Sequence, residues 1–154
     1  MQELIAVGDR APDFTLPDQN NRKVNLVGLS ADRRVLLVFF PLAFTGNCEG
    51  ELALIRDRLP EFENDSLTTV AISVGPPPTH KVWSSAQGFL FPLLSDFWPH
   101  GAVAQQYGVF SERHGYPLRG TVLVDRDRTV LFADVAEAGA PRDATVWERA
   151  LRLA

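Results

Sequence analysis

The chain has 154 residues, of which 45% are hydrophobic and 22% charged, and a formal net charge of -4. These values fit one soluble globular domain over residues 1–154, and they argue against nucleic acid or an anionic membrane as the main partner. The sequence has no apolar run long enough to span a membrane and no visible signal peptide. The single cysteine excludes an internal disulfide. A cytoplasmic setting is therefore expected.

The first third of the chain predicts a hairpin, a strand and a helix. Two short segments, 11–16 and 23–26, flank a polar turn and predict an N-terminal β-hairpin. Residues 34–40 are almost entirely apolar, which is typical of a strand buried on both faces. Helical spacing of apolar residues follows over 46–59, and Pro60 is expected to end or kink that helix.

The middle of the chain predicts shorter elements. Residues 68–74 form a second β-branched run that indicates a strand, and Gly-Pro-Pro-Pro at 75–78 stops it. Thr79 is expected to cap the next helix. A short edge strand over 91–94 and a short helix over 102–107 complete this part.

The last part of the chain predicts a second hairpin and a final helix. Residues 120–124 and 129–134 read as two strands joined by a tight turn, and residues 142–153 form an amphipathic helix. The whole order of elements predicts an α/β sandwich with a central mixed sheet.

Cys48 is the only cysteine, and it lies where a predicted strand meets a predicted helix. Unpaired N–H groups and the positive end of the helix dipole favour a thiolate at such a position. Thr45 lies one helical turn earlier and places a hydroxyl beside the sulfur, and Pro41 would shape the turn and shield the sulfur from water. The combination indicates peroxide reduction, in which a thiolate attacks one oxygen and the other leaves as hydroxide or alkoxide.

That chemistry also needs positive charge near the leaving oxygen. Arg119 is the best candidate, because it stands at the head of the predicted strand 120–124, where side chains can project toward a site at the strand ends. Glu51 is expected to pair with an arginine and to orient it. No metal and no cofactor are expected, because the histidines lack metal-ligand spacing: His80, His100 and His114.

Several motifs resemble those of the peroxiredoxins: Pro41-x-x-x-Thr45-x-x-Cys48, Arg119-Gly120-Thr121, Ala11-Pro12-Asp13-Phe14 and the spacing Cys48-x-x-Glu51. Three longer segments are most similar to the one-cysteine, AhpE-type members of that family, so the similarity extends over most of the chain: 35–47, 72–83 and 91–110. The resemblance implies a thioredoxin-like fold and a homodimer or a larger assembly.

The same resemblance implies a thiol-dependent peroxidase that reduces hydrogen peroxide, organic hydroperoxides and peroxynitrite. It assigns the peroxidatic role, through a sulfenic acid, to Cys48, and it assigns polarisation of the peroxide to Thr45 and Arg119. Pro41 would shield the sulfur and Glu51 would support the site. Since no resolving cysteine exists, an external thiol must reduce the sulfenic acid. In AhpE-like proteins this is a low-molecular-weight thiol such as mycothiol, with a mycoredoxin-type partner.

Other interpretations of Cys48 remain open. One is a thiol–disulfide oxidoreductase, although the C-x-x-C motif is absent. Another is a redox-sensing binding module, in which oxidation of Cys48 switches a partner surface, and the last is a purely structural domain. Asn47 and Glu49 depart from the residues usual beside the peroxidatic cysteine, which bears on rate and substrate preference. Phe44 is expected in the core, or else in a peroxide pocket or dimer face.

Overall fold

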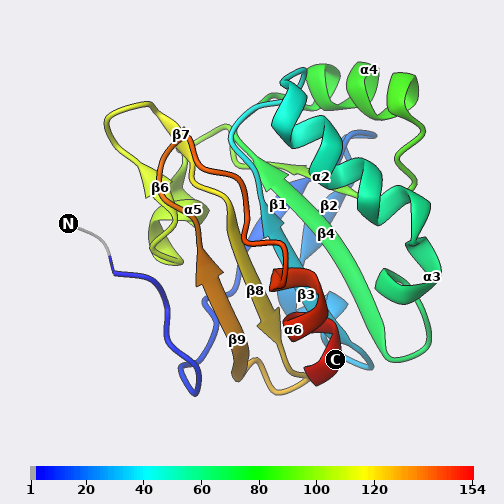
Figure 1. The fold of residues 1–154 in the computed structure, drawn as a ribbon, viewed down its shortest axis with the longest axis vertical. Coiled ribbons are helices and arrows are strands. Elements are labelled where there is room, and N and C mark those ends of the chain that lie inside the picture. The colour runs from blue at the N-terminus through cyan, green and yellow to red at the C-terminus, as the bar shows by residue number, and fades with distance from the viewer. Residues whose placement is uncertain (1–2) are drawn as a thin grey trace.

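A five-stranded mixed sheet forms the centre of the molecule in the computed structural model, which describes residues 3–154 (Figure 1). The order of its strands is β5–β4–β3–β8–β9, where β3, β4 and β5 run parallel and β8 and β9 run antiparallel to their neighbours. The strands span the following residues: β3 Arg34–Phe39, β4 Leu67–Ser73, β5 Leu93–Ser95, β8 Gly120–Val124 and β9 Val130–Val135. The prediction of an α/β sandwich with a mixed sheet is therefore confirmed.

Alternate residues of the central strand β3 contribute side chains to two separate hydrophobic cores. Leu36 and Val38 pack into the core that also holds residues of α2, α4 and α6, whereas Val35, Leu37 and Phe39 pack into the core beside α5 and the N-terminal segment. Because successive side chains of a strand point to opposite faces, a strand covered on both sides is apolar throughout. This explains the unbroken apolar run in the sequence.

The predicted N-terminal hairpin is present as β1 (Thr15–Pro17) and β2 (Lys23–Asn25), which pair antiparallel. A short helix that the sequence analysis did not predict, α1 (Leu26–Leu29), follows at once. Its first turn is capped by Asn25, whose side-chain oxygen accepts a hydrogen bond of 3.0 Å from the N–H of Gly28. An asparagine at this position satisfies a backbone donor that the helix leaves free.

Two helix boundaries differ from the predictions. Helix α2 (Gly46–Asp57) ends before Pro60, and this proline lies in the first turn of the next helix, α3 (Leu59–Phe62). A proline is tolerated there because the first turn of a helix needs no N–H donor. Helix α4 (Pro77–Gln87) begins at its own proline, so Thr79 lies inside the helix and does not cap it.

The C-terminal helix α6 spans Val146–Leu153 and so begins later than predicted. The delay has a local cause, since the carboxylate of Asp143 accepts hydrogen bonds from the N–H and the hydroxyl of Thr145, at 2.8 and 2.6 Å. Such side-chain bonds compete with helix formation. Arg142 therefore lies in an irregular segment between β9 and α6, and its side chain extends into the interior of the molecule.

The remaining elements are short. Helix α5 (Ala102–Gln106) confirms the predicted short helix, and strands β6 (Phe110–Ser111) and β7 (Tyr116–Pro117) form a small hairpin that was not predicted. No helix between residues 3 and 154 is long and apolar enough to cross a membrane.

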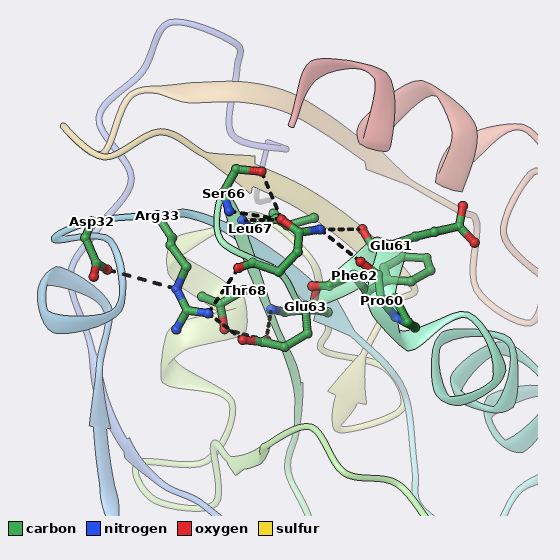
Figure 2. Close-up of polar contacts among 11 residues, drawn as sticks. Asp32, Arg33, Pro60, Glu61, Phe62, Glu63, Ser66, Leu67 and Thr68 are labelled. Carbon is green, nitrogen blue, oxygen red and sulfur yellow. Dashed lines mark hydrogen bonds and ion pairs between the residues drawn. The ribbon is translucent and has the colours of Figure 1, made fainter.

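Hydrogen bonds between polar groups connect the elements at the end of the sheet where β4 begins (Figure 2). The carboxylate of Glu63 accepts hydrogen bonds from Arg33, at 2.5 Å, and from the hydroxyl of Thr68, at 2.7 Å. The side chain of Asn64 accepts another, of 3.1 Å, from the N–H of Leu67. These contacts join the starts of β3 and β4 to the end of α3, and Cys48 lies at the opposite, carboxyl ends of the two strands.

The buried imidazole of His80 makes stability depend on pH. His80 is fully buried on α4, with Nδ1 3.2 Å from the hydroxyl of Ser95, and this burial lowers its pKa to about 4. The unfolded chain, with an ordinary histidine pKa near 6.5, takes up the proton first as pH falls. The stabilisation is therefore complete above pH 6.5 and is lost progressively toward pH 4.

We expect the free energy of unfolding to fall by about 2 kcal/mol between pH 7 and pH 5 on account of this histidine. Urea unfolding of the wild type and of His80→Gln at both pH values measures the effect. The variant should lack this part of the pH dependence, whereas an identical pH dependence in both proteins would contradict the assignment.

Candidate functional site

Cys48 lies in the first turn of α2 and its side chain is 0% exposed. The chain reaches this point from the carboxyl end of β3, through a tight loop that begins at Pro41. Thr45 occupies the N-cap position of α2, but its hydroxyl donates a hydrogen bond of 2.7 Å to the carbonyl of Leu42 and does not cap the helix. The lone pairs of that hydroxyl are therefore available to accept a bond from another molecule.

The loop before α2 has a defined shape. The carbonyl of Pro41 accepts a hydrogen bond of 2.8 Å from the buried hydroxyl of Ser73 at the end of β4. Phe44 has a left-handed backbone, with φ of 64°, which is uncommon outside glycine. Its ring lies 6.1 Å from that of Trp83 and is nevertheless 55% exposed, so the expectation that Phe44 belongs to the core was wrong.

Arg119 approaches the sulfur from β8. Since Thr121 pairs with Val38 in the antiparallel register of β8 and β3, the residues just before Thr121 lie beside the end of β3. Nη2 of Arg119 is 3.8 Å from Sγ of Cys48, and the side chain is 8% exposed. The structure thus places a nearly buried cation in contact with the sulfur, as the position of Arg119 at the head of the strand predicts.

Glu51 lies one turn along α2 and contacts two arginines. Its Oε1 is 3.4 Å from Nε of Arg119 and accepts a hydrogen bond from Nη1 of Arg142, while its Oε2 accepts one of 3.0 Å from the backbone N–H of Arg142. Arg142 also donates to the hydroxyl of Thr121, at 2.8 Å, and to the carbonyl of Gly120, at 3.0 Å. The expected pairing of Glu51 with an arginine is present, with a second arginine in addition.

Arg142 was not predicted as a residue of the site, because the predicted final helix 142–153 includes it. A signal was available, since a cation in the first turn of a helix opposes the positive end of the helix dipole. Arg142 also follows Pro141 directly and precedes a turn-forming Asp143. Those neighbours favour an irregular segment, from which a long side chain can reach inward.

The charged side chains beside Cys48 carry a net positive charge, which one more anion would balance. Arg119 and Arg142 carry two positive charges and Glu51 carries one negative charge, so the three together are one unit positive. Burial lowers the pKa of the Arg142 guanidinium, and neighbouring Arg119 acts in the same direction, while Glu51 opposes both. A thiolate on Cys48, which Arg119 contacts, would bring the net charge of these groups to zero.

A cavity of about 170 Å³ opens beside these residues. Its lining comes from the start of α2, from the β7–β8 segment and from the loop after β9: Pro41, Leu42, Thr45, Asn47, residues 116–119 and residues 137–139. Arg119 both lines the cavity and contacts the sulfur. The cavity is the size of a small organic molecule and ends at the groups that could polarise a peroxide.

Replacing Glu51 by glutamine is expected to lower the free energy of unfolding by about 2 kcal/mol. The amide keeps an acceptor for one arginine but leaves two buried cations without a counter-charge. Urea unfolding at pH 7 measures the loss. Glu49→Gln is the matched control, because it removes one charge from the same helical turn and should change the stability by less than 0.5 kcal/mol, on the order of other surface substitutions. Equal stabilities of the two variants would contradict the expectation.

Comparisons with known proteins agree with this geometry. Residues 7–133, which include Cys48 and Arg119, match the AhpC/TSA family. Over 148 residues the chain is 59% identical to alkyl hydroperoxide reductase E of Mycobacterium tuberculosis (strain ATCC 25618 / H37Rv), an alignment that covers 96% of this chain and 97% of that protein. The structure resembles the crystal structure of peroxidoxin BcpB from Mycobacterium tuberculosis, with a TM-score of 0.84, 35% identity and coverage of 96% and 94%. It also resembles the reduced 2-Cys peroxiredoxin of Plasmodium vivax, with a TM-score of 0.82, 27% identity and coverage of 95% and 80%.

Proposed function

The chain belongs to the AhpC/TSA family and is a peroxiredoxin with the thioredoxin-like fold, and from this premise we propose that it reduces hydrogen peroxide, organic hydroperoxides and peroxynitrite at Cys48. One observation carries the proposal. The buried sulfur lies at the start of α2, and the guanidinium of Arg119 is 3.8 Å from it, beside a cavity that a small peroxide can enter.

In the proposed reaction the thiolate of Cys48 attacks one peroxide oxygen. A sulfur–oxygen bond forms, the oxygen–oxygen bond breaks, and its electron pair leaves with the distal oxygen. This oxygen takes up a proton to become water or an alcohol, or leaves as part of nitrite when the substrate is peroxynitrite. The guanidinium of Arg119 donates hydrogen bonds to the oxygen that gains charge. The hydroxyl of Thr45 already donates to a backbone carbonyl, so it accepts a hydrogen bond from the peroxide and fixes its orientation.

Two further residues, Pro41 and Glu51, support Cys48, Thr45 and Arg119 in the proposed reaction. Pro41 is buried and has no N–H, so it excludes water from the sulfur without adding a competing donor. Glu51 forms an ion pair with Arg119, with Oε1 3.4 Å from Nε, and in this way helps to orient the guanidinium toward Cys48. Positioning matters because a small misplacement of reacting groups costs a large part of the rate.

The product on Cys48 is a sulfenic acid, and this chain has no second cysteine to resolve it. An external thiol must therefore attack the sulfenic sulfur, releasing water and leaving a mixed disulfide that a second thiol reduces. We take this reductant to be a low-molecular-weight thiol such as mycothiol, with a mycoredoxin-type protein for the second step. A cytoplasmic homodimer, or a larger assembly of it, is the form of the protein that the proposal assumes.

The test is the second-order rate constant for oxidation of Cys48 by hydrogen peroxide. Stopped-flow tryptophan fluorescence suits the measurement, because Trp83 contacts Phe44 in the loop before Cys48. A sulfenic-acid reagent and intact-mass analysis identify the product. The proposal predicts a constant that exceeds that of free cysteine by orders of magnitude, with one trapped adduct.

A rate no faster than that of free cysteine, for hydrogen peroxide and for an organic hydroperoxide alike, would overturn the proposal. Slow oxidation combined with oxidation-dependent capture of a partner protein would instead identify a redox-sensing binding module. The exposed ring of Phe44, which lies close to Cys48 in the chain, is the feature that such a module would use.

A further inference from the structure

The outer part of the cavity beside Cys48 carries a carboxylate that the proposed chemistry does not use. Glu137 is exposed and lines the cavity, and no hydrogen bond or ion pair of its side chain is found within residues 3–154. Arg119 is the other charged residue of the lining, and its charge is directed to Glu51 and Cys48. The cavity thus has a cationic inner end and an anionic outer end.

The position of Glu137 is fixed relative to Arg119. The N–H of Ala136 donates to the carbonyl of Arg119 at 3.1 Å, and Nη1 of Arg119 donates to the carbonyl of Ala140 at 3.3 Å. Between these two points the N–H of Ala140 closes a turn on the carbonyl of Glu137 at 3.0 Å, with Gly139 in the left-handed conformation that glycine permits. The same guanidinium that contacts the sulfur therefore also holds the loop that carries the carboxylate.

We propose that Glu137 sets the charge preference of the site, so that hydroperoxides with a neutral or cationic substituent react faster than those with an anionic one. The inference rests on the proposed function, because it assumes that a peroxide occupies the cavity with its oxygen atoms next to Thr45 and Arg119. Pro41 and Arg119, which line the cavity, are buried, and Arg119 contacts the buried sulfur of Cys48. The organic substituent of the peroxide must therefore point outward, past Glu137.

The expected size of this preference is modest and depends on salt. An exposed carboxylate acts on a charge several ångströms away through a largely aqueous medium, so it changes each rate about threefold. A cationic and an anionic substituent shift in opposite directions, and the ratio of their rates changes about tenfold at low ionic strength. Because the Debye length is about 3 Å in 1 M salt, the preference should nearly vanish there.

The experiment uses cumene hydroperoxide carrying a para ammonium or a para carboxylate group. Stopped-flow fluorescence gives the rate constant for Cys48 oxidation by each peroxide at low and at high salt. In the wild type the ammonium compound should react faster than the carboxylate compound at low salt. Glu137→Gln should reduce the ratio of the two rates about tenfold, and Glu137→Lys should reduce it further.

Asp65→Asn is the matched control, since it removes one negative charge from an exposed turn before β4, at the opposite end of the sheet. This variant should keep the wild-type ratio. An unchanged ratio in both Glu137 variants, or an equal change in Asp65→Asn, would overturn the inference. The rate of the wild type with uncharged hydrogen peroxide tests the proposed function separately, so the failure of one can be distinguished from the failure of the other.

Discussion

Cys48→Ser protein is expected to turn over no peroxide while it keeps the native fold. A serine hydroxyl is not ionised near neutral pH and does not form a stable oxidised state with peroxide, so the attack on the oxygen–oxygen bond cannot occur. The smaller oxygen fits the buried position that the sulfur occupies, and it can accept a hydrogen bond from Arg119. Peroxide consumption in the presence of a reducing thiol measures the loss.

The fold of this variant is checked by far-ultraviolet circular dichroism and by thermal unfolding. Both should resemble those of the wild type, since the substitution removes no carbon atom from the core. Residual turnover above the level of the reducing thiol alone would mean that Cys48 is not the reacting group.

Arg119→Ala is expected to slow the oxidation of Cys48 by hydrogen peroxide at least about a hundredfold. The guanidinium is the cation in contact with the sulfur, and the loss of one donor aimed at a developing anion typically costs about a hundredfold to a thousandfold in rate. Arg119→Lys should fall between the alanine variant and the wild type, because an ammonium keeps the charge but cannot reach both Glu51 and the peroxide with a planar fork. Stopped-flow fluorescence gives the three rate constants.

Arg126→Ala is the matched control for this experiment, because it removes an exposed arginine from the turn that joins β8 to β9. Its oxidation rate should equal that of the wild type. If Arg119→Ala kept a wild-type rate at an unchanged fold, Arg119 would have no part in the reaction.

The long elements of this fold could be predicted from local sequence because their burial imposes a pattern. Residues 34–40 and 68–74 were predicted as strands, and the structure has them as Arg34–Phe39 and Leu67–Ser73. The hairpin of β6 and β7 could not be found in this way, because strands of two residues show no periodicity. That hairpin is held by tertiary contacts, such as the hydrogen bond of 2.7 Å between His100 and the carbonyl of Gly115.

The residues of the candidate site also differ in how well the sequence alone predicts them. Pro41, Thr45 and Cys48 lie within one loop and helix start, so their spacing in the sequence already indicates their proximity. Arg119 could be predicted from its place at the head of a strand and from the resemblance to the peroxiredoxins. Arg142 was not predicted, because its neighbours Pro141 and Asp143 indicate only an irregular segment, and the folded structure is needed to show that its side chain meets Glu51.

The pairing of Glu51 with two distant arginines has a consequence for the protein during its synthesis. Cys48 leaves the ribosome 71 residues before Arg119, and Glu51 leaves it 91 residues before Arg142. Until most of the chain has been made, the sulfur has neither the cation that contacts it nor the strand β8 that carries this cation. The sulfur of the growing chain therefore has no cation beside it, and the contact between Arg119 and Cys48 forms only after β8 has been made and has paired with β3.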